Sequence, residues 1–296
     1  MLYGTAPQRS RFARFVTDIS ERELLHPTWT TVPKLMLHTI LPFFTKRPGQ
    51  ILGSTFLLIM VWGTHGSLEL LGQVWPSWRG PGVDVGHRPS LLPGIPWDNE
   101  LLSFALGFAL LVLVPIALIR WVYKQPLADY GLALPPKGRR LLALQTFLLL
   151  TLPSLIGFWR AASIPSMHQL YPFFRPFSST GQFIAYELAY LLFFIAIEFI
   201  FRGYLLFGLA GVLDREVRHT GGGLRGAFYF GRYALLIQML SYTAWHLGKP
   251  LPELWGTVIW GLGAGAAAYA IRSIWPVVLS HWLLNVFLDA VSLQYP

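Results

Sequence analysis

The chain has 296 residues, of which 54% are hydrophobic and 12% are charged, and its mean hydropathy is +0.49. Charged residues make up about 25% of a typical soluble domain, so this composition excludes an ordinary soluble protein and predicts a polytopic membrane protein. The net charge is +9 and cysteine is absent, which excludes disulfides, thiol nucleophiles and cysteine-ligated zinc.

The first 50 residues form a basic segment that carries seven Lys and Arg residues. The spacing of Phe12, Phe15 and Ile19 fits an amphipathic helix on the membrane surface, and a partly ordered basic tail is the alternative. The apolar stretch 35–44 is too short to cross a bilayer, and we expect Pro42 to interrupt it.

Seven apolar runs follow, and each is about as long as a membrane-spanning helix. They cover residues 51–71, 101–121, 141–159, 182–201, 227–245, 253–271 and 275–293. We therefore predict an all-α, polytopic transmembrane helical bundle of about seven spans. Residues 51–124 would hold the first two spans and a loop rich in Pro and Trp, and residues 125–296 would form the core.

Lys and Arg are numerous in every second loop and few in the loops between. This alternation predicts a cytoplasmic N-terminus and an outer C-terminus in what we expect to be a bacterial plasma membrane. Because the basic residues lie in loops between apolar runs, we expect the bilayer, and no nucleic acid, as the partner.

Glu198 and Arg202 interrupt an apolar run from 183 to 213. They are about one helical turn apart, so they can form an ion pair on one face of the helix. Each ionisable group in a membrane-length segment costs about 2.5–3.5 kcal/mol, so the chain keeps such groups for a buried pair or for chemistry. Glu187 falls near the same face, and we expect it to be a packing or interfacial carboxylate.

His281, Asn285 and Asp289 recur every four residues and so lie on one stripe of the last apolar run. His246 ends another run and by itself could be an ordinary interfacial histidine. A carboxylate beside histidines can deprotonate water, while an imidazole and an amide stabilise the resulting oxyanion. The same groups could equally hold a divalent metal, although the chain has no His-Glu-x-x-His motif.

Three motifs, in this order and all on apolar segments, resemble the signatures of the CPBP family. This family contains the CAAX proteases and bacteriocin-processing enzymes and is also called the Abi family. Its signatures are Glu-Glu-x-x-x-Arg, aromatic-x-x-x-His and His-x-x-x-Asn. Here they read Ile197-Glu198-Phe-Ile-Phe-Arg202-Gly203, Tyr242-Thr-Ala-Trp-His246 and His281-Trp-Leu-Leu-Asn285. The resemblance covers about residues 125–293, including the element Asp129-Tyr-Gly-Leu132.

The resemblance implies an intramembrane endopeptidase in which a Glu activates water while His and Asn assist the transition state. It implies a protein or peptide substrate within the lipid bilayer. Carried over by motif, the catalytic residues would be Glu198, His246, His281 and Asn285, with Arg202 and Tyr242 in support.

The first Glu of the family motif, which usually has the catalytic role, is replaced here by Ile197. Adjacent helix positions point about 100° apart, so Glu198 does not inherit the same direction. Either Glu198 is the base in a rearranged site, or the chain is a proteolytically silent scaffold or immunity protein on the same fold. A small transporter is a third hypothesis, disfavoured because the sequence has no internal repeat.

The seven-span topology places His246 near the outer end of its helix, whereas Glu198 and His281 lie nearer the cytoplasmic side. For these groups to meet, one helix must be broken, shifted or re-entrant. We expect this irregularity at residues 248–252, which contain Gly and two Pro residues.

Overall fold

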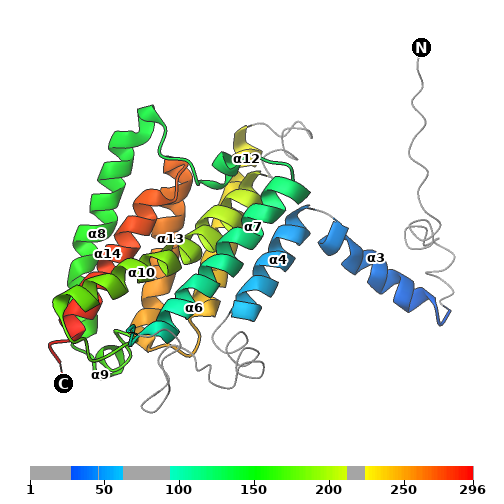
Figure 1. Ribbon diagram of the computed structural model, residues 1–296. Helices are drawn as coiled ribbons and strands as arrows, with labels where there is room; N and C mark the ends of the chain where they lie inside the picture. The colour runs from blue at the N-terminus through cyan, green and yellow to red at the C-terminus, as the bar shows by residue number, and fades with distance from the viewer. Residues whose placement is uncertain (1–27, 46, 63–93, 212–223, 296) are drawn as a thin grey trace. The chain divides into compact units, whose positions relative to one another are not determined.

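The computed structural model describes residues 28–45, 47–62, 94–211 and 224–295, and these residues form helices and no strand (Figure 1). The predicted all-helical class is therefore confirmed for them. The chain divides into two compact units, Met1–Gly53 and Ser54–Pro296, and each is described by itself. The amphipathic helix expected around Phe12 and Ile19 lies outside the described residues.

The first unit contains helix α3, which spans Thr31–Thr45. Its length is about 22 Å at 1.5 Å per residue, so it is too short to cross a hydrocarbon core of about 30 Å. The expectation that Pro42 would interrupt this segment is wrong, because the helix continues past it to Thr45. Helix α4, Arg47–Trp62, begins in the first unit and ends in the second.

The remaining described helices belong to the second unit. They are α6 (Asp98–Phe108), η1 (Ala109–Leu113), α7 (Val114–Ala117), η2 (Leu118–Val122), η3 (Leu127–Tyr130), η4 (Lys137–Arg139), α8 (Arg140–Ala162), α9 (Pro165–His168), α10 (Thr180–Glu198), η5 (Phe199–Phe207), α12 (Leu224–Trp245), α13 (Leu251–Ile271) and α14 (Trp275–Ser292).

Four continuous helical stretches are long and apolar enough to cross a membrane among the residues that the structure describes. They are Glu100–Val122, Lys137–Ala162, Thr180–Gly211 and Leu251–Ile271. Helices α12 and α14 form where two further spans were predicted, and α4 covers the described part of the first run. The total of about seven spans stays a prediction.

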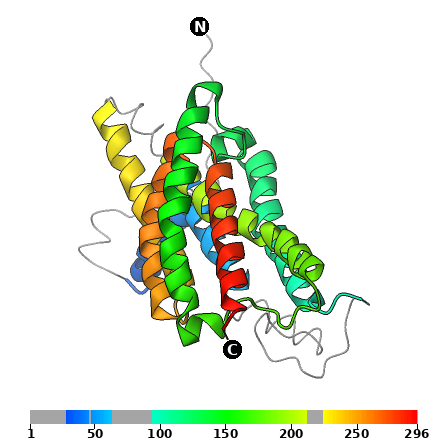
Figure 2. The same cartoon turned by 90° about the vertical axis from the view of Figure 1, so that its left-hand side faces the viewer.

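Three pairs of helices make the main contacts of the second unit: α8 with α14, α12 with α13, and α10 with α6 (Figures 1 and 2). Helix α10 and η5 join into one continuous helix, Thr180–Gly211, of 32 residues. At about 48 Å this helix exceeds the hydrocarbon thickness, a mismatch that a tilt would accommodate. In both views α10 runs obliquely across its neighbours. The middle of this continuous helix contacts side chains of α12, α13 and α14.

The helix break expected at residues 248–252 is an ordinary turn between two helices. Residues 246–250 make a turn between α12 and α13, in which Gly248 has a φ of +92°. Only a residue without a Cβ adopts this left-handed conformation easily. No re-entrant helix forms in this described stretch.

Helices α12 and α13 approach closely because the facing positions on α13 are small. A Cβ added at Gly265 would lie 2.6 Å from Leu235 Cδ1 and 2.7 Å from Gln238 Nε2. Gln238 is fully buried, and its Nε2 donates a hydrogen bond of 2.5 Å to the Gly261 carbonyl across the same interface. Small residues allow such backbone approach in membrane helices.

We predict that Gly265→Ala lowers the free energy of unfolding by about 1–3 kcal/mol, because Leu235 and Gln238 must move to make room. Gly263→Ala is the matched control, since a Cβ there meets only Leu150 Cδ2 at 3.7 Å. Thermal unfolding of the two variants in detergent measures the difference. Equal unfolding temperatures would show that the interface is not tightly packed.

We also predict the sidedness of the chain, which suits single-cysteine labelling because the natural sequence has no cysteine. Leu134 and Ser163 are both exposed and lie beyond opposite ends of α8. In intact cells a membrane-impermeant maleimide should label Ser163→Cys, on the predicted outer side, and should spare Leu134→Cys until the cells are opened. The reverse pattern would invert the orientation derived from the Lys and Arg counts.

Candidate functional site

The first and third motifs meet at the carboxylate of Glu198, which is fully buried. The Nε atom of Arg202 lies 3.2 Å from Oε2 of Glu198. The Nδ1 atom of His281 donates a hydrogen bond of 2.6 Å to Oε1, and Trp260 Nε1 donates to the same oxygen at 3.4 Å. Because an ionised carboxylate only accepts, the proton of His281 lies on Nδ1 and its Nε2 is left for chemistry.

Tyr242, from the second motif, packs against the guanidinium of Arg202. The ring of Tyr242 lies 4.0 Å from Arg202 Cζ, in a cation–π contact. Arg202 lies in the π-helical segment η5, and such segments are frequent at functional sites. The following Gly203 is required by packing, since a Cβ there would come within 3.0 Å of the Tyr130 carbonyl oxygen.

His246 follows α12 directly, and its Nδ1 lies 2.8 Å from the carbonyl oxygen of Tyr242. A carbonyl can only accept, so Nδ1 carries the proton and Nε2 has a free lone pair. Burial lowers the pKa of His246 to about 3, so the imidazole is neutral at pH 7. Its Nε2 lies 3.7 Å from Oε1 of Glu253, a residue at the start of α13.

Asn285 is oriented by a carboxylate on its own helix. Its Nδ2 donates a hydrogen bond of 3.1 Å to Oδ2 of Asp289, which is fully buried. Each amide nitrogen has two donor hydrogens, so one remains for another acceptor. The predicted stripe on α14 therefore consists of a histidine held by α10 and an amide held by Asp289.

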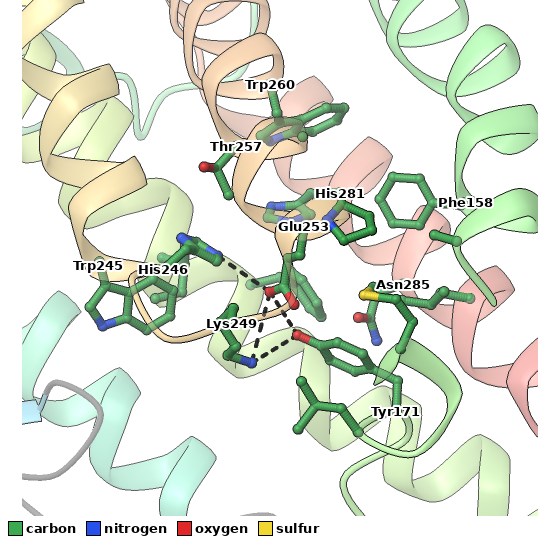
Figure 3. Close-up of a pocket in the computed structure, with 18 of the residues that line it drawn as sticks. Phe158, Tyr171, Trp245, His246, Lys249, Glu253, Thr257, Trp260, His281 and Asn285 are labelled. Carbon is green, nitrogen blue, oxygen red and sulfur yellow. Dashed lines mark hydrogen bonds and ion pairs between the residues drawn. The ribbon is translucent and has the colours of Figure 1, made fainter. Parts of the chain in front are cut away.

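A cavity of about 690 Å³ gathers three of the four expected catalytic residues, which are His246, His281 and Asn285 (Figure 3). Glu198 and Arg202 are not among the residues that line it. The wall is formed at this point by Ile197, the residue in place of the first Glu of the motif. Glu198 lies behind this wall, in contact with His281 and Trp260, which do line the cavity.

Residues 179–287 match the sequence model of a family described as type II CAAX prenyl endopeptidase Rce1-like. The chain carries an Rce1-like segment. The match contains all three motifs and confirms the resemblance to the CPBP family. Together with the four apolar helices, the match indicates an integral membrane protein that contains a segment similar to a membrane-protease family. No curated protein and no solved structure matches the chain.

The same cavity contains a second carboxylate, Glu253, that the sequence analysis did not single out. Tyr171 OH donates a hydrogen bond of 2.8 Å to Oε1 of Glu253, and Lys249 Nζ lies 3.8 Å from the same oxygen. Lys249 also donates to Tyr171 OH at 2.9 Å. All three residues line the cavity with His246 (Figure 3). The only signal in the sequence was a Glu at the first turn of an apolar run, seven residues after His246.

A metal site was the alternative use of these histidines and carboxylates. Within the described ranges, no group of three or more His, Cys, Asp and Glu residues is placed to hold a metal ion. The side chains form two separate pairs instead, His281 with Glu198 and His246 with Glu253. The described residues of the Rce1-like segment therefore do not fit a metal centre.

We predict that Arg202→Met lowers the free energy of unfolding by about 3–5 kcal/mol, because it leaves the fully buried Glu198 without its cationic partner. Arg120→Met is the control, since Arg120 is exposed. Thermal unfolding in detergent compares the two variants with the unchanged protein. Similar unfolding temperatures for both would mean that the ion pair adds nothing to the fold.

Proposed function

We propose that the protein is an intramembrane endopeptidase of the CPBP type, which cleaves a protein or peptide substrate in a cavity within the membrane. The observation that carries this proposal is the convergence of His246, His281 and Asn285 on one cavity. These residues come from two different motifs of the segment that matches a prenyl endopeptidase family. Imidazole and amide groups are suited to stabilising the oxyanion of peptide hydrolysis.

In this proposal Glu198 is a positioning residue. It holds Nδ1 of His281 at 2.6 Å and so directs Nε2 of that ring to the substrate. Its complete burial and its absence from the cavity wall argue against Glu198 as the group that activates water. Arg202 balances its charge, and Tyr242 covers Arg202 while its carbonyl orients His246.

A proteolytically silent scaffold or immunity protein is the second candidate. The observation that favours it is Ile197, which lines the cavity where the family has a carboxylate. A transporter is the third candidate, because a polar cavity inside a membrane bundle could also pass a small solute. The peptidase would cleave a peptide bound in the cavity. The scaffold would not, and the transporter would move a solute without cleavage.

We predict that the protein, reconstituted in lipid vesicles, cleaves at least one of two probes. These are a quenched fluorogenic peptide library and a farnesylated peptide ending in the Cys-aliphatic-aliphatic-X sequence. His281→Ala and Glu198→Gln should each lower kcat/KM at least 100-fold, since one removes a cavity imidazole and the other weakens its anchor.

Thr257→Val is the control for this assay, because Thr257 lines the same cavity and is outside the proposed machinery. It should cleave like the unchanged protein. Failure of folded, unchanged protein to cleave either probe would reject the peptidase in favour of the scaffold. Ion-coupled solute uptake by the same vesicles, without cleavage, would support the transporter.

A further inference from the structure

Glu253 holds one carboxylate oxygen in a fixed position inside the cavity. Its Oε1 accepts the hydrogen bond from Tyr171 OH and is 3.8 Å from Lys249 Nζ (Figure 3). Burial raises the pKa of Tyr171 well above its usual value, so this hydroxyl keeps its proton and remains a donor. The side chain of Glu253 is therefore oriented by a loop residue and by a lysine one turn away on the same side of the cavity.

The other oxygen of Glu253 has no such restraint. Its Oε2 is buried and accepts no hydrogen bond from the part of the chain that the structure describes. Oε2 of Glu198 likewise accepts no hydrogen bond from the described residues, but it lies 3.2 Å from the charged Arg202 Nε. Oε1 of Glu198 accepts from His281, and Glu198 is not among the residues that line the cavity. Of these two carboxylates, Glu253 is the one that can take up a proton from a group in the cavity.

His246 completes the arrangement. Its Nε2, which carries a lone pair, lies 3.7 Å from Oε1 of Glu253, and both atoms are acceptors. Two acceptors at this distance interact favourably when a molecule with two donor hydrogens, such as water, binds to both. A water bound in this way would be oriented for attack and would lie beside its base.

We propose that Glu253 is the catalytic base of this protein, in the role that Ile197 cannot perform. This inference rests on the proposed endopeptidase function. Oε1 of Glu253, the oxygen to which the bridging water donates, takes a proton from the water while the water oxygen bonds to the scissile carbonyl carbon. The carbonyl π pair moves to its oxygen, which the Asn285 amide stabilises by a hydrogen bond. When the C=O bond re-forms, the C–N bond breaks and the proton on Glu253 passes to the leaving amine.

The test is the Glu253→Gln variant in the vesicle assay with the same two probes. Gln has the same size and its carbonyl oxygen can accept the bond from Tyr171, but it cannot take up the proton. General base catalysis contributes about 10²–10⁴ in rate, so kcat should fall at least 100-fold while KM changes less than threefold. Thr257→Val, one turn further along α13, should keep both constants.

Rescue distinguishes a base from a packing residue. Ile197→Glu, introduced into the Glu253→Gln protein, places a carboxylate on another wall of the same cavity and should raise kcat at least tenfold. A loss of activity that Ile197→Glu does not restore would overturn the proposal. So would a Glu253→Gln protein with kcat within threefold of the unchanged enzyme.

A second variant tests the proposal if Glu253→Gln does not fold. If thermal unfolding shows that Glu253→Gln does not fold, Glu253→Asp withdraws the carboxylate by one methylene and should lower kcat at least tenfold; an unchanged kcat would overturn the proposal. The assay distinguishes failure of the endopeptidase proposal from failure of the proposal for Glu253. Absence of cleavage by the unchanged protein removes the endopeptidase and its base together, whereas cleavage that is independent of residue 253 removes only the base.

Discussion

The buried ion pair of Glu198 and Arg202 is the constraint on which the site depends. Both side chains are fully inaccessible, and the chain can keep such charges in an apolar segment only if each is compensated. Compensation comes from outside their own helix as well. His281 reaches Glu198 from α14, Trp260 reaches it from α13, and Tyr242 covers Arg202 from α12. Three other helices are thereby fixed around one charged pair.

Because of this ion pair, two tasks fall to different carboxylates: balancing charge while orienting His281, and accepting a proton during a reaction. A carboxylate that balances a guanidinium and anchors an imidazole is poorly placed to accept a further proton, because its interactions depend on its negative charge. The structure offers a second pair, His246 with Glu253, on the turn and helix that follow Tyr242. One carboxylate then maintains the architecture and orients His281, and the other is free to exchange protons during a reaction.

Local spacing made much of this site predictable. The interval of four residues predicted the pairing of Glu198 with Arg202, because helical geometry alone brings such residues together. The same interval predicted that Asn285 and Asp289 lie on one stripe, and in the structure a hydrogen bond joins them. Contacts across the bundle were not predictable from spacing. Tyr171 comes from a loop and Glu253 from another helix, and their approach depends on packing. The oblique course of α10 among its neighbours likewise depends on packing across the bundle, so the sequence alone could not show how His246, Glu198 and His281 are placed relative to one another.

The position of the cavity has a consequence for the biology of the substrate. Its wall includes Ile164 and Tyr171, which follow α8, and Gly248 and Lys249, which precede α13. The Lys and Arg pattern assigns both connections to the non-cytoplasmic side. In this predicted orientation, a substrate of the proposed endopeptidase would reach the cavity from the outer side of the membrane. We therefore expect its clients to be secreted or membrane-anchored polypeptides.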